Sequence, residues 1–312
     1  MEENEFDFIC LGAGPAGLSA AQYASRANIK TLVIDQSMPG GQVINISSLE
    51  NYPGVFPAVN GFAFVEGMKK QAVEFGAKII QAIVSSLDKK DGLFSVTTNK
   101  GVYVSKTLLL ATGAEHRTLG VKGEKEFLGR GVSYCATCDG PFFRNKNIFV
   151  VGGGDSACDE ATYLASLTDR VTIVHRKSQF RAQKAVAQRV LSNPRISVMF
   201  NSAVEEIKGD GKVSSVVIKN TEDGSTKELP CDAVFIFVGM IPRTELFATL
   251  KTDEGGYIIT DEDMKTSVPG LYVAGDVRSK SFRQIVTACA DGAIASHSAE
   301  KFIRESAGEV YR

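Results

Sequence analysis

The run Gly12-Ala13-Gly14-Pro15-Ala16-Gly17 is the most informative stretch of the sequence. It follows a short apolar stretch, Phe6–Leu11, and precedes a stretch rich in helix formers, Leu18–Ala27. Strand, glycine turn and helix in this order are typical of a dinucleotide-binding βαβ unit, because the glycines let the backbone approach a pyrophosphate and let helix and strand pack closely. Asp35 lies 21 residues after Gly14, at the end of the next apolar run Thr31–Ile34. A carboxylate there can accept hydrogen bonds from ribose hydroxyls, so the sequence favours a dinucleotide site over an ordinary tight turn.

A second glycine turn, Gly152-Gly153-Gly154-Asp155-Ser156-Ala157, again stands between an apolar run and a helical pattern. The position 21 residues after Gly154 holds His175 instead of an acid, and Arg176, Lys177 and Arg181 follow. Bases at this position suit a 2′-phosphate, so this turn is predicted to take NADP(H) rather than NAD(H). The alternative is a solvated basic face. Two such turns suggest a flavin and a nicotinamide, and Asp35 suits the unphosphorylated ribose of FAD.

The remaining elements repeat around the two turns, which are 140 residues apart between Gly12 and Gly152. Each copy continues with a second strand and a hairpin signal, KKDG near residue 90 and EDG near residue 223. We therefore predict an α/β fold of two Rossmann-like, three-layer dinucleotide-binding domains, each with a β-meander. The tail 270–303 is too short for a domain, so it should pack back and make one unit discontinuous. One long α/β sheet is the alternative.

The overall composition excludes several functional classes. Thirty-five Lys and Arg against thirty-six Asp and Glu give a net charge of −1, which argues against a nucleic-acid surface. The stretch Phe8–Ser25 lacks charges, but its glycines and Pro15 exclude a single apolar helix. The acidic N-terminus is unlike a secretory signal. We expect a cytoplasmic protein without membrane or nucleic-acid partners.

Cys135 and Cys138 form a Cys-x-x-Cys pair just before the second glycine turn. Such a pair serves a redox dithiol or half of a zinc site, and no second ligand pair has zinc spacing, so we expect no metal. Asp139 can deliver or take the proton that disulfide reduction needs, or it can cap a helix. The other cysteines lie in or beside apolar runs and are predicted to be core residues: Cys10, Cys158, Cys231 and Cys289.

Taken together, the motifs GAGPAG, CATCDG, GGGDSA, HRKSQFRA and AGDVRSKSFRQ resemble, in this order, those of bacterial low-molecular-weight thioredoxin reductases. The resemblance covers essentially the whole chain. It implies an FAD domain at residues 1–116 and 246–312, with an NADPH domain at 117–245 that carries the redox pair. It also implies a homodimer in which NADPH reduces FAD, FAD reduces the Cys135–Cys138 disulfide, and the dithiol reduces oxidised thioredoxin, with Asp139 as the catalytic acid.

The resemblance further implies the cofactor-binding residues. Those for FAD are Gly12, Gly14, Pro15, Ala16, Gly17, Asp35, Gln36, Gly40, Gly41, Gln42, Asn51, Val84, Thr112, Gly113, Gly275, Asp276, Arg283, Gln284 and Ile285. Those for NADPH are Gly152, Gly154, Asp155, Ser156, His175, Arg176, Lys177 and Arg181.

Two residues depart from the family pattern. Lys177 stands where many members have a second arginine and Asp159 where many have glutamate. Because lysine cannot hold a phosphate bidentately, the preference for NADPH over NADH is expected to be softer. The alternative functions are a ferredoxin or flavodoxin–NADP reductase, which would not need the cysteine pair, a reductase of a glutaredoxin-like protein, and a nucleotide-sensing module without turnover.

Overall fold

The computed structural model describes residues 4–46, 49, 51–247 and 249–308, without the side chains of Cys138 and Phe247. It divides into two compact units, Met1–Glu115 with Ile241–Arg312, and His116–Met240. The first unit is therefore discontinuous. The domain boundaries predicted from the sequence, 116/117 and 245/246, stay a prediction about the functional domains. The connections between the units pair as a two-stranded ribbon of β7 (Ala114–His116) and β16 (Met240–Pro242).

The first unit is built on a seven-stranded sheet with the order β3-β2-β1-β6-β5-β4, in which β17 also pairs with β6. Strands β1, β2, β3, β6 and β17 run parallel, and β4-β5-β6 form the antiparallel meander. Its elements are β1 (Glu5–Leu11), α1 (Pro15–Arg26), β2 (Thr31–Asp35), η1 (Gly41–Asn45), α2 (Gly61–Glu74), β3 (Lys78–Gln81), β4 (Val84–Lys90), β5 (Leu93–Thr98), β6 (Gly101–Leu110), η3 (Glu245–Phe247), β17 (Leu271–Val273), η4 (Gly275–Val277) and α6 (Ile285–Ser306).

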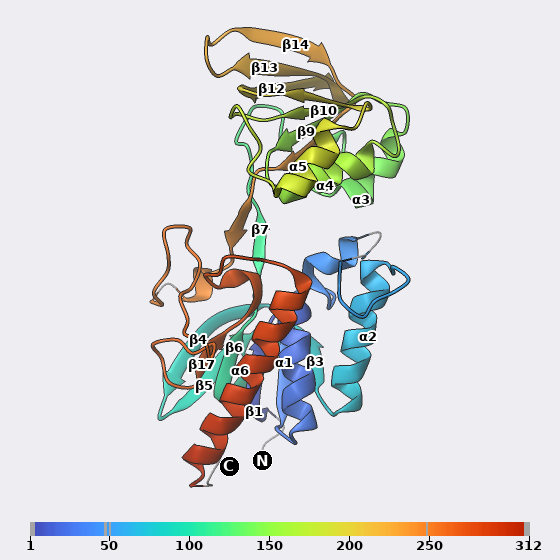
Figure 1. Cartoon of the computed structure of the whole chain (residues 1–312). Helices are drawn as coiled ribbons and strands as arrows, with labels where there is room; N and C mark the ends of the chain where they lie inside the picture. The colour runs from blue at the N-terminus through green and yellow to red at the C-terminus, as the bar shows by residue number, and fades with distance from the viewer. Residues whose placement is uncertain (1–3, 47–48, 50, 248, 309–312) are drawn as a thin grey trace. The chain divides into compact units, whose positions relative to one another are not determined.

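Alternation along β1 creates the layers of this unit. Phe8 and Cys10 pack with α1, α2 and α6, whereas Ile9 and Leu11 pack on the opposite face with the meander and the later loops. Helices α1 and α6 lie side by side (Figure 1).

The second unit repeats the plan with a five-stranded parallel sheet of order β11-β10-β9-β15-β8 and a separate meander β12-β13-β14. Its elements are β8 (Val132–Ser133), α3 (Ala136–Asp139), η2 (Gly140–Phe143), β9 (Ile148–Gly152), α4 (Asp155–Leu164), β10 (Val171–Val174), α5 (Lys184–Leu191), β11 (Ile196–Met199), β12 (Ser202–Asp210), β13 (Lys212–Asn220), β14 (Thr226–Pro230) and β15 (Ala233–Phe237). The predicted fold class, two Rossmann-like domains each with a meander, is confirmed. Among the described residues, no helix is both long and apolar enough to cross a membrane.

Because α1 and α6 pack closely, a side chain at Gly292 in α6 is expected to destabilise the protein. A Cβ atom added at Gly292 would lie 2.1 Å from the Ala16 carbonyl oxygen, whereas one at Gly67 in α2 meets nothing within 4 Å. Gly292→Ala is expected to lower the stability by about 1–3 kcal/mol, because the helices must separate. Gly67→Ala is the matched control and should be neutral or stabilising, since alanine favours helix by about 1 kcal/mol. Thermal denaturation of both variants checks this, and equal midpoints would contradict it.

Candidate active site

The first glycine turn is formed by close backbone contacts. Gly12 has a φ of +107°, and a Cβ atom there would lie 2.3 Å from the Ala111 carbonyl oxygen. A Cβ atom on Gly17 would lie 1.9 Å from the Gly12 carbonyl oxygen. Gly14, the N-cap of α1, has nothing within 4 Å of its Cβ position. Two glycines are thus needed for the turn itself, and the third leaves its surroundings open for a ligand at the helix N-terminus.

Asp35 supports the turn directly. Its Oδ2 accepts a hydrogen bond from the Ala13 amide at 2.7 Å, and its Oδ1 accepts one from the Ser37 amide at 2.8 Å. The carboxylate is therefore fixed at the end of β2. It retains lone pairs that can accept hydrogen bonds from ribose hydroxyl groups. The sequence position of Asp35 predicts the ribose role but not the hydrogen bond to the turn.

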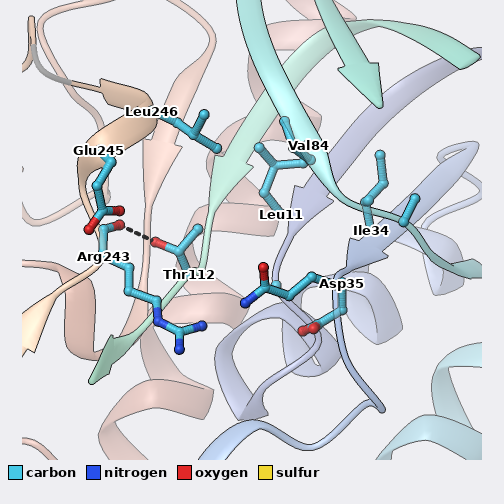
Figure 2. A pocket seen from close by; sticks show the side chains of 11 residues that line it. Leu11, Ile34, Asp35, Val84, Thr112, Arg243, Glu245 and Leu246 are labelled. Atoms are coloured by element: carbon cyan, nitrogen blue, oxygen red, sulfur yellow. Dashed lines mark hydrogen bonds between the residues drawn. The ribbon is translucent and has the colours of Figure 1, made fainter. Parts of the chain in front are cut away.

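A pocket opens beside Asp35. Five of the predicted FAD residues line it: Gly12, Asp35, Gln36, Val84 and Thr112. Leu11, Ile34 and Ala82 also line it, as do three residues from beyond the second unit, Arg243, Glu245 and Leu246. Figure 2 shows Arg243, Glu245 and Leu246 on one side of the pocket and Ile34 and Asp35 on the other, with the Thr112 hydroxyl donating to the Arg243 carbonyl oxygen at 2.7 Å. No sequence motif indicates that Arg243 and Glu245 line this pocket.

The loop carrying Gly40, Gly41 and Gln42 lies against the same turn. The Gly40 amide donates to the Ala13 carbonyl oxygen at 2.8 Å, and a Cβ atom on Gly41 would lie 3.3 Å from the Gly14 Cα. The Gln42 amide group donates to the Ala114 carbonyl oxygen at 2.5 Å.

Gly113 is also tied to the segment that returns from the second unit. Its carbonyl oxygen accepts a hydrogen bond from the Arg243 amide at 3.0 Å. Residues 112–113 and 243 are thus held together by two hydrogen bonds.

The remaining predicted FAD residues come from the chain's C-terminal part and one loop. Gly275 and Asp276 lie in η4, and Ile285 is the first residue of α6. Gln284, the N-cap of α6, accepts a hydrogen bond from the Asn51 side-chain amide at 3.1 Å. The Arg283 guanidinium lies over the Tyr257 ring at 3.6 Å. The structure therefore brings Asn51 and Gln284 together although 233 positions separate them.

Asp276 is a further candidate for contact with a ligand in this unit. Its Oδ1 is buried without a hydrogen-bond partner, although 42% of the whole side chain is exposed. Burial raises the pKa of Asp276, and the positive charges of Lys280 and Arg283 oppose that rise. Its buried Oδ1 lies 3.7 Å from the Lys280 ammonium, so the exposed part of the carboxylate is the part that can accept a hydrogen bond from a hydroxyl group of a dinucleotide.

The second glycine turn has the same geometry as the first. A Cβ atom on Gly152 would lie 2.3 Å from the Phe237 carbonyl oxygen, and Gly154 has nothing within 4 Å of its Cβ position. Asp155 accepts hydrogen bonds from the Gln183 amide and side chain at 2.7 and 3.1 Å, and Ser156 is exposed at the start of α4. Asp155 thus anchors the segment that carries the bases.

His175 differs from the other members of the predicted basic cluster. Its ring lies directly beneath Gly153, where an added Cβ atom would approach it to 2.2 Å. It is 5% exposed, and burial lowers its pKa, as do the charges of Arg181, Arg176 and Lys177. A neutral, buried imidazole supports the turn and does not supply a positive charge. Arg176, Lys177 and Arg181 are exposed and retain that capacity.

Cys135 stands immediately before the short helix α3 and is disulfide-bonded. Its sulfur lies 3.4 Å from the Thr137 hydroxyl oxygen, and its amide donates to the Ser133 hydroxyl at 3.0 Å. The side chain of Cys138 lies outside the described residues. Asp139 is the N-cap of η2, but its carboxylate makes no capping hydrogen bond, so the capping interpretation lacks support.

The four remaining cysteines are free and buried, as predicted: Cys10, Cys158, Cys231 and Cys289. Burial raises the pKa of Cys158 to about 11 and that of Cys231 to about 12, and it raises the pKa of Cys10 and Cys289 as well. These thiols are thus kept protonated and unreactive at neutral pH.

Comparison with known proteins agrees with this geometry. The pyridine nucleotide-disulphide oxidoreductase model matches residues 6–292. The chain is 56% identical to a thioredoxin reductase of Treponema pallidum (strain Nichols) over 301 residues, 96% of this chain and 98% of that protein. The chain belongs to the pyridine nucleotide-disulphide oxidoreductase family. It is also 48% identical to a thioredoxin reductase of Listeria innocua over 306 residues, 97% of this chain and 96% of the relative. A Lactococcus lactis thioredoxin reductase crystal structure superposes with a TM-score of 0.91 at 42% identity, covering 96% of this chain and 99% of that one.

Membership makes the chain an oxidoreductase that uses FAD and NADPH to reduce a disulfide. The residues present fit both nucleotides. In the first unit, the open surroundings of Gly14 and the partly exposed carboxylate of Asp276 suit FAD. In the second, the open surroundings of Gly154 and three exposed bases suit NADPH.

A carboxyl group in the second unit that belongs to no sequence motif predicts a pH dependence of stability. Glu160 in α4 has a buried Oε2 without a hydrogen-bond partner, and burial raises its pKa to about 7. In the unfolded chain the pKa of a glutamate side chain is about 4.3. Between these values the folded chain binds more protons than the unfolded chain, so this group lowers stability progressively as pH rises toward 7.

Glu160→Gln removes that cost. We expect the variant to gain about 1–3 kcal/mol over the parent as pH rises from 5 to 8. Thermal or urea denaturation at both pH values measures this, with the exposed Glu74→Gln as control. A stability difference that does not change with pH would show that Glu160 is ionised in the folded protein throughout.

Proposed function

We propose that this enzyme reduces the disulfide of thioredoxin, using electrons that pass from NADPH through FAD to a Cys135–Cys138 pair. The observation that carries this proposal is the state of the cysteines. Cys135 is disulfide-bonded at the start of α3, whereas Cys10, Cys158, Cys231 and Cys289 are buried and free. Cys138 is the sequence neighbour that a Cys-x-x-Cys redox pair would use. Relatives at 46–56% identity are named thioredoxin reductases.

The first unit is proposed to bind FAD, which supplies the two-electron redox chemistry when it is bound. The Gly12–Gly17 turn would place the pyrophosphate at the N-terminus of α1, and Asp35 would accept ribose hydroxyls beside the pocket. Asp276 and the Asn51–Gln284 pair would contact the remainder of the cofactor.

The second unit is proposed to bind NADPH. Gly154 leaves room for the pyrophosphate at the N-terminus of α4. Arg176, Lys177 and Arg181 are exposed around the end of β10, where a 2′-phosphate would lie. The buried His175 ring supports the turn from beneath.

The chain's own part in the exchange is acid–base chemistry on sulfur. A thiolate of the reduced pair would attack one sulfur of the partner disulfide, and the second cysteine would then displace the partner and restore the Cys135–Cys138 bond. Each released thiolate needs one proton. Asp139 is the proposed donor and acceptor, because it follows Cys138 directly and its carboxylate is not used as a cap.

We also propose the cellular location, the oligomeric state and the hinges of the enzyme. One redox pair together with buried free thiols is a pattern of cysteine use typical of the reducing cytosol, so we expect a cytoplasmic enzyme. The family resemblance also implies a homodimer. The connections near Glu115–Thr118 and Arg243–Glu245 are the candidate hinges if the second unit must turn to serve two steps.

Replacing Cys138 tests the electron route. The parent enzyme should reduce thioredoxin disulfide with NADPH, and Cys138→Ser should abolish this while NADPH still bleaches the bound flavin, because the two inputs are separate. Anaerobic titration and a thiol count measure both. The two-step route is wrong if bleaching is also lost with FAD bound. A preference for glutaredoxins in a partner panel would contradict the substrate.

The exposed bases should set nucleotide choice. Arg176→Gln combined with Lys177→Gln is expected to raise the KM for NADPH at least tenfold while leaving that for NADH unchanged. Each charge-assisted phosphate contact contributes about 1.5–3 kcal/mol. Steady-state kinetics with both nucleotides check this, with the exposed Lys212→Gln as control. An unchanged ratio of the two KM values would remove these residues from the phosphate site.

Asp139→Asn distinguishes catalysis from capping. Loss of general acid–base help should slow disulfide reduction by about 10²- to 10⁴-fold with an unchanged thermal midpoint. A cap would instead cost about 1 kcal/mol of stability at near-normal turnover. Turnover and thermal midpoint are measured on the same variant, so a lowered midpoint with normal turnover would assign Asp139 to capping.

A further inference from the structure

A cluster of buried charges lies behind Asp276, and the function proposed above gives it no role. The side chains of Lys280 and Asp291 are each 8% exposed, and that of Arg278 is 15% exposed. The cluster joins the η4 turn to the middle of α6. Burying paired charges costs desolvation that their attraction barely repays, so such a cluster is weak evidence for stability alone.

Asp291 holds the cluster together. Its Oδ2 accepts hydrogen bonds from the Gly275 amide at 3.0 Å and from the Lys280 ammonium at 3.0 Å. Its Oδ1 accepts one from the Arg278 guanidinium at 2.9 Å. One buried carboxylate on α6 thus fixes the backbone immediately before Asp276 and two cations that follow it.

Lys280 faces Asp276 from inside the protein. Its ammonium also donates to the Thr287 hydroxyl at 3.3 Å, and it lies 3.7 Å from the Asp276 Oδ1. That distance gives an ion pair without a hydrogen bond, and this Oδ1 has no hydrogen-bond partner. The charges acting on Asp276 are Lys280 and Arg283, which favour its ionised form, and Asp291, which opposes it.

We propose that Lys280 is a positioning residue whose ammonium group, held by Asp291 and Thr287, keeps Asp276 ionised and directed at the flavin site. This inference rests on the proposal above that Asp276 contacts the bound FAD. An ionised carboxylate is a pure acceptor, so it suits a hydroxyl-bearing part of the cofactor. The lysine supplies the compensating charge from the buried side, and the exposed side of Asp276 is left for the ligand.

Without Lys280, FAD binding is expected to weaken as the pH falls. Burial already raises the pKa of Asp276, and removing Lys280 removes one of the two charges that oppose the rise. Asp276 of a Lys280→Met variant would then take up a proton at a pH where the parent stays ionised. Binding that requires the ionised form weakens by up to about tenfold for each pH unit below that pKa.

The experiment measures FAD release from the holoenzyme by flavin fluorescence on dilution, at pH 6 to 8. The parent and Lys106→Met, which removes an exposed lysine paired with Asp7, should show the same nearly pH-independent dissociation constant. Lys280→Met should bind FAD about tenfold more weakly at pH 6 than at pH 8. Lys280→Gln keeps an amide donor for Asp291 and should show the same slope, so it replaces Lys280→Met if that variant does not fold.

Two further variants separate the possible failures. Asp276→Asn with Lys280→Met should lose the slope, because the titrating group is gone. A uniform loss of FAD affinity at every pH in the lysine variants, or no loss, would overturn the role of Lys280. Normal FAD binding by Asp276→Asn alone would instead show that the proposed contact between Asp276 and FAD is wrong.

Discussion

One backbone contact, made twice, determines where this protein can bind nucleotides. At Gly12 and at Gly152, a carbonyl oxygen at the end of the neighbouring parallel strand lies 2.3 Å from the position a Cβ atom would take. The chain can turn there only without a side chain, and it leads straight into α1 or α4. Because parallel strands end together at this edge of the sheet, the residues that follow each strand gather around the two turns. Asp35, Asp276 and the bases after β10 all owe their places to this constraint.

The sequence predicted the parts of the fold that have a long local pattern, and it missed strands that are short or interrupted. Both glycine turns and the helices after them follow from glycine spacing and apolar runs. Strands β3 and β11, each only four residues long, were missed. Strand β12 was missed because a bulge between Val204 and Glu206 breaks the alternation that marks a strand. The residues Val204 and Ile207 are buried three positions apart instead of two.

The sequence predicted the site residues that belong to a motif and missed those that do not. Arg243 and Glu245 reach the pocket only because the chain returns from the second unit, and no local pattern encodes that return. His175 has the sequence position of a phosphate-binding base, yet its ring is buried beneath Gly153. Whether an imidazole faces solvent or packs under a turn depends on tertiary contacts. The buried partners of Asp276 were equally hidden, since Lys280 and Asp291 look like ordinary surface residues in the sequence.

The discontinuity of the first unit has a consequence for biosynthesis. A ribosome that has released residues 116–240 has supplied everything the second unit contains, but the first unit still lacks β17, η4 and α6. Its N-terminal strands and α1 therefore wait, with the face that α6 covers still exposed, until residues 271–306 have been made. The second unit is continuous in the sequence, so it can fold while the chain is being made. The first unit can close only once β17, η4 and α6 have been synthesised.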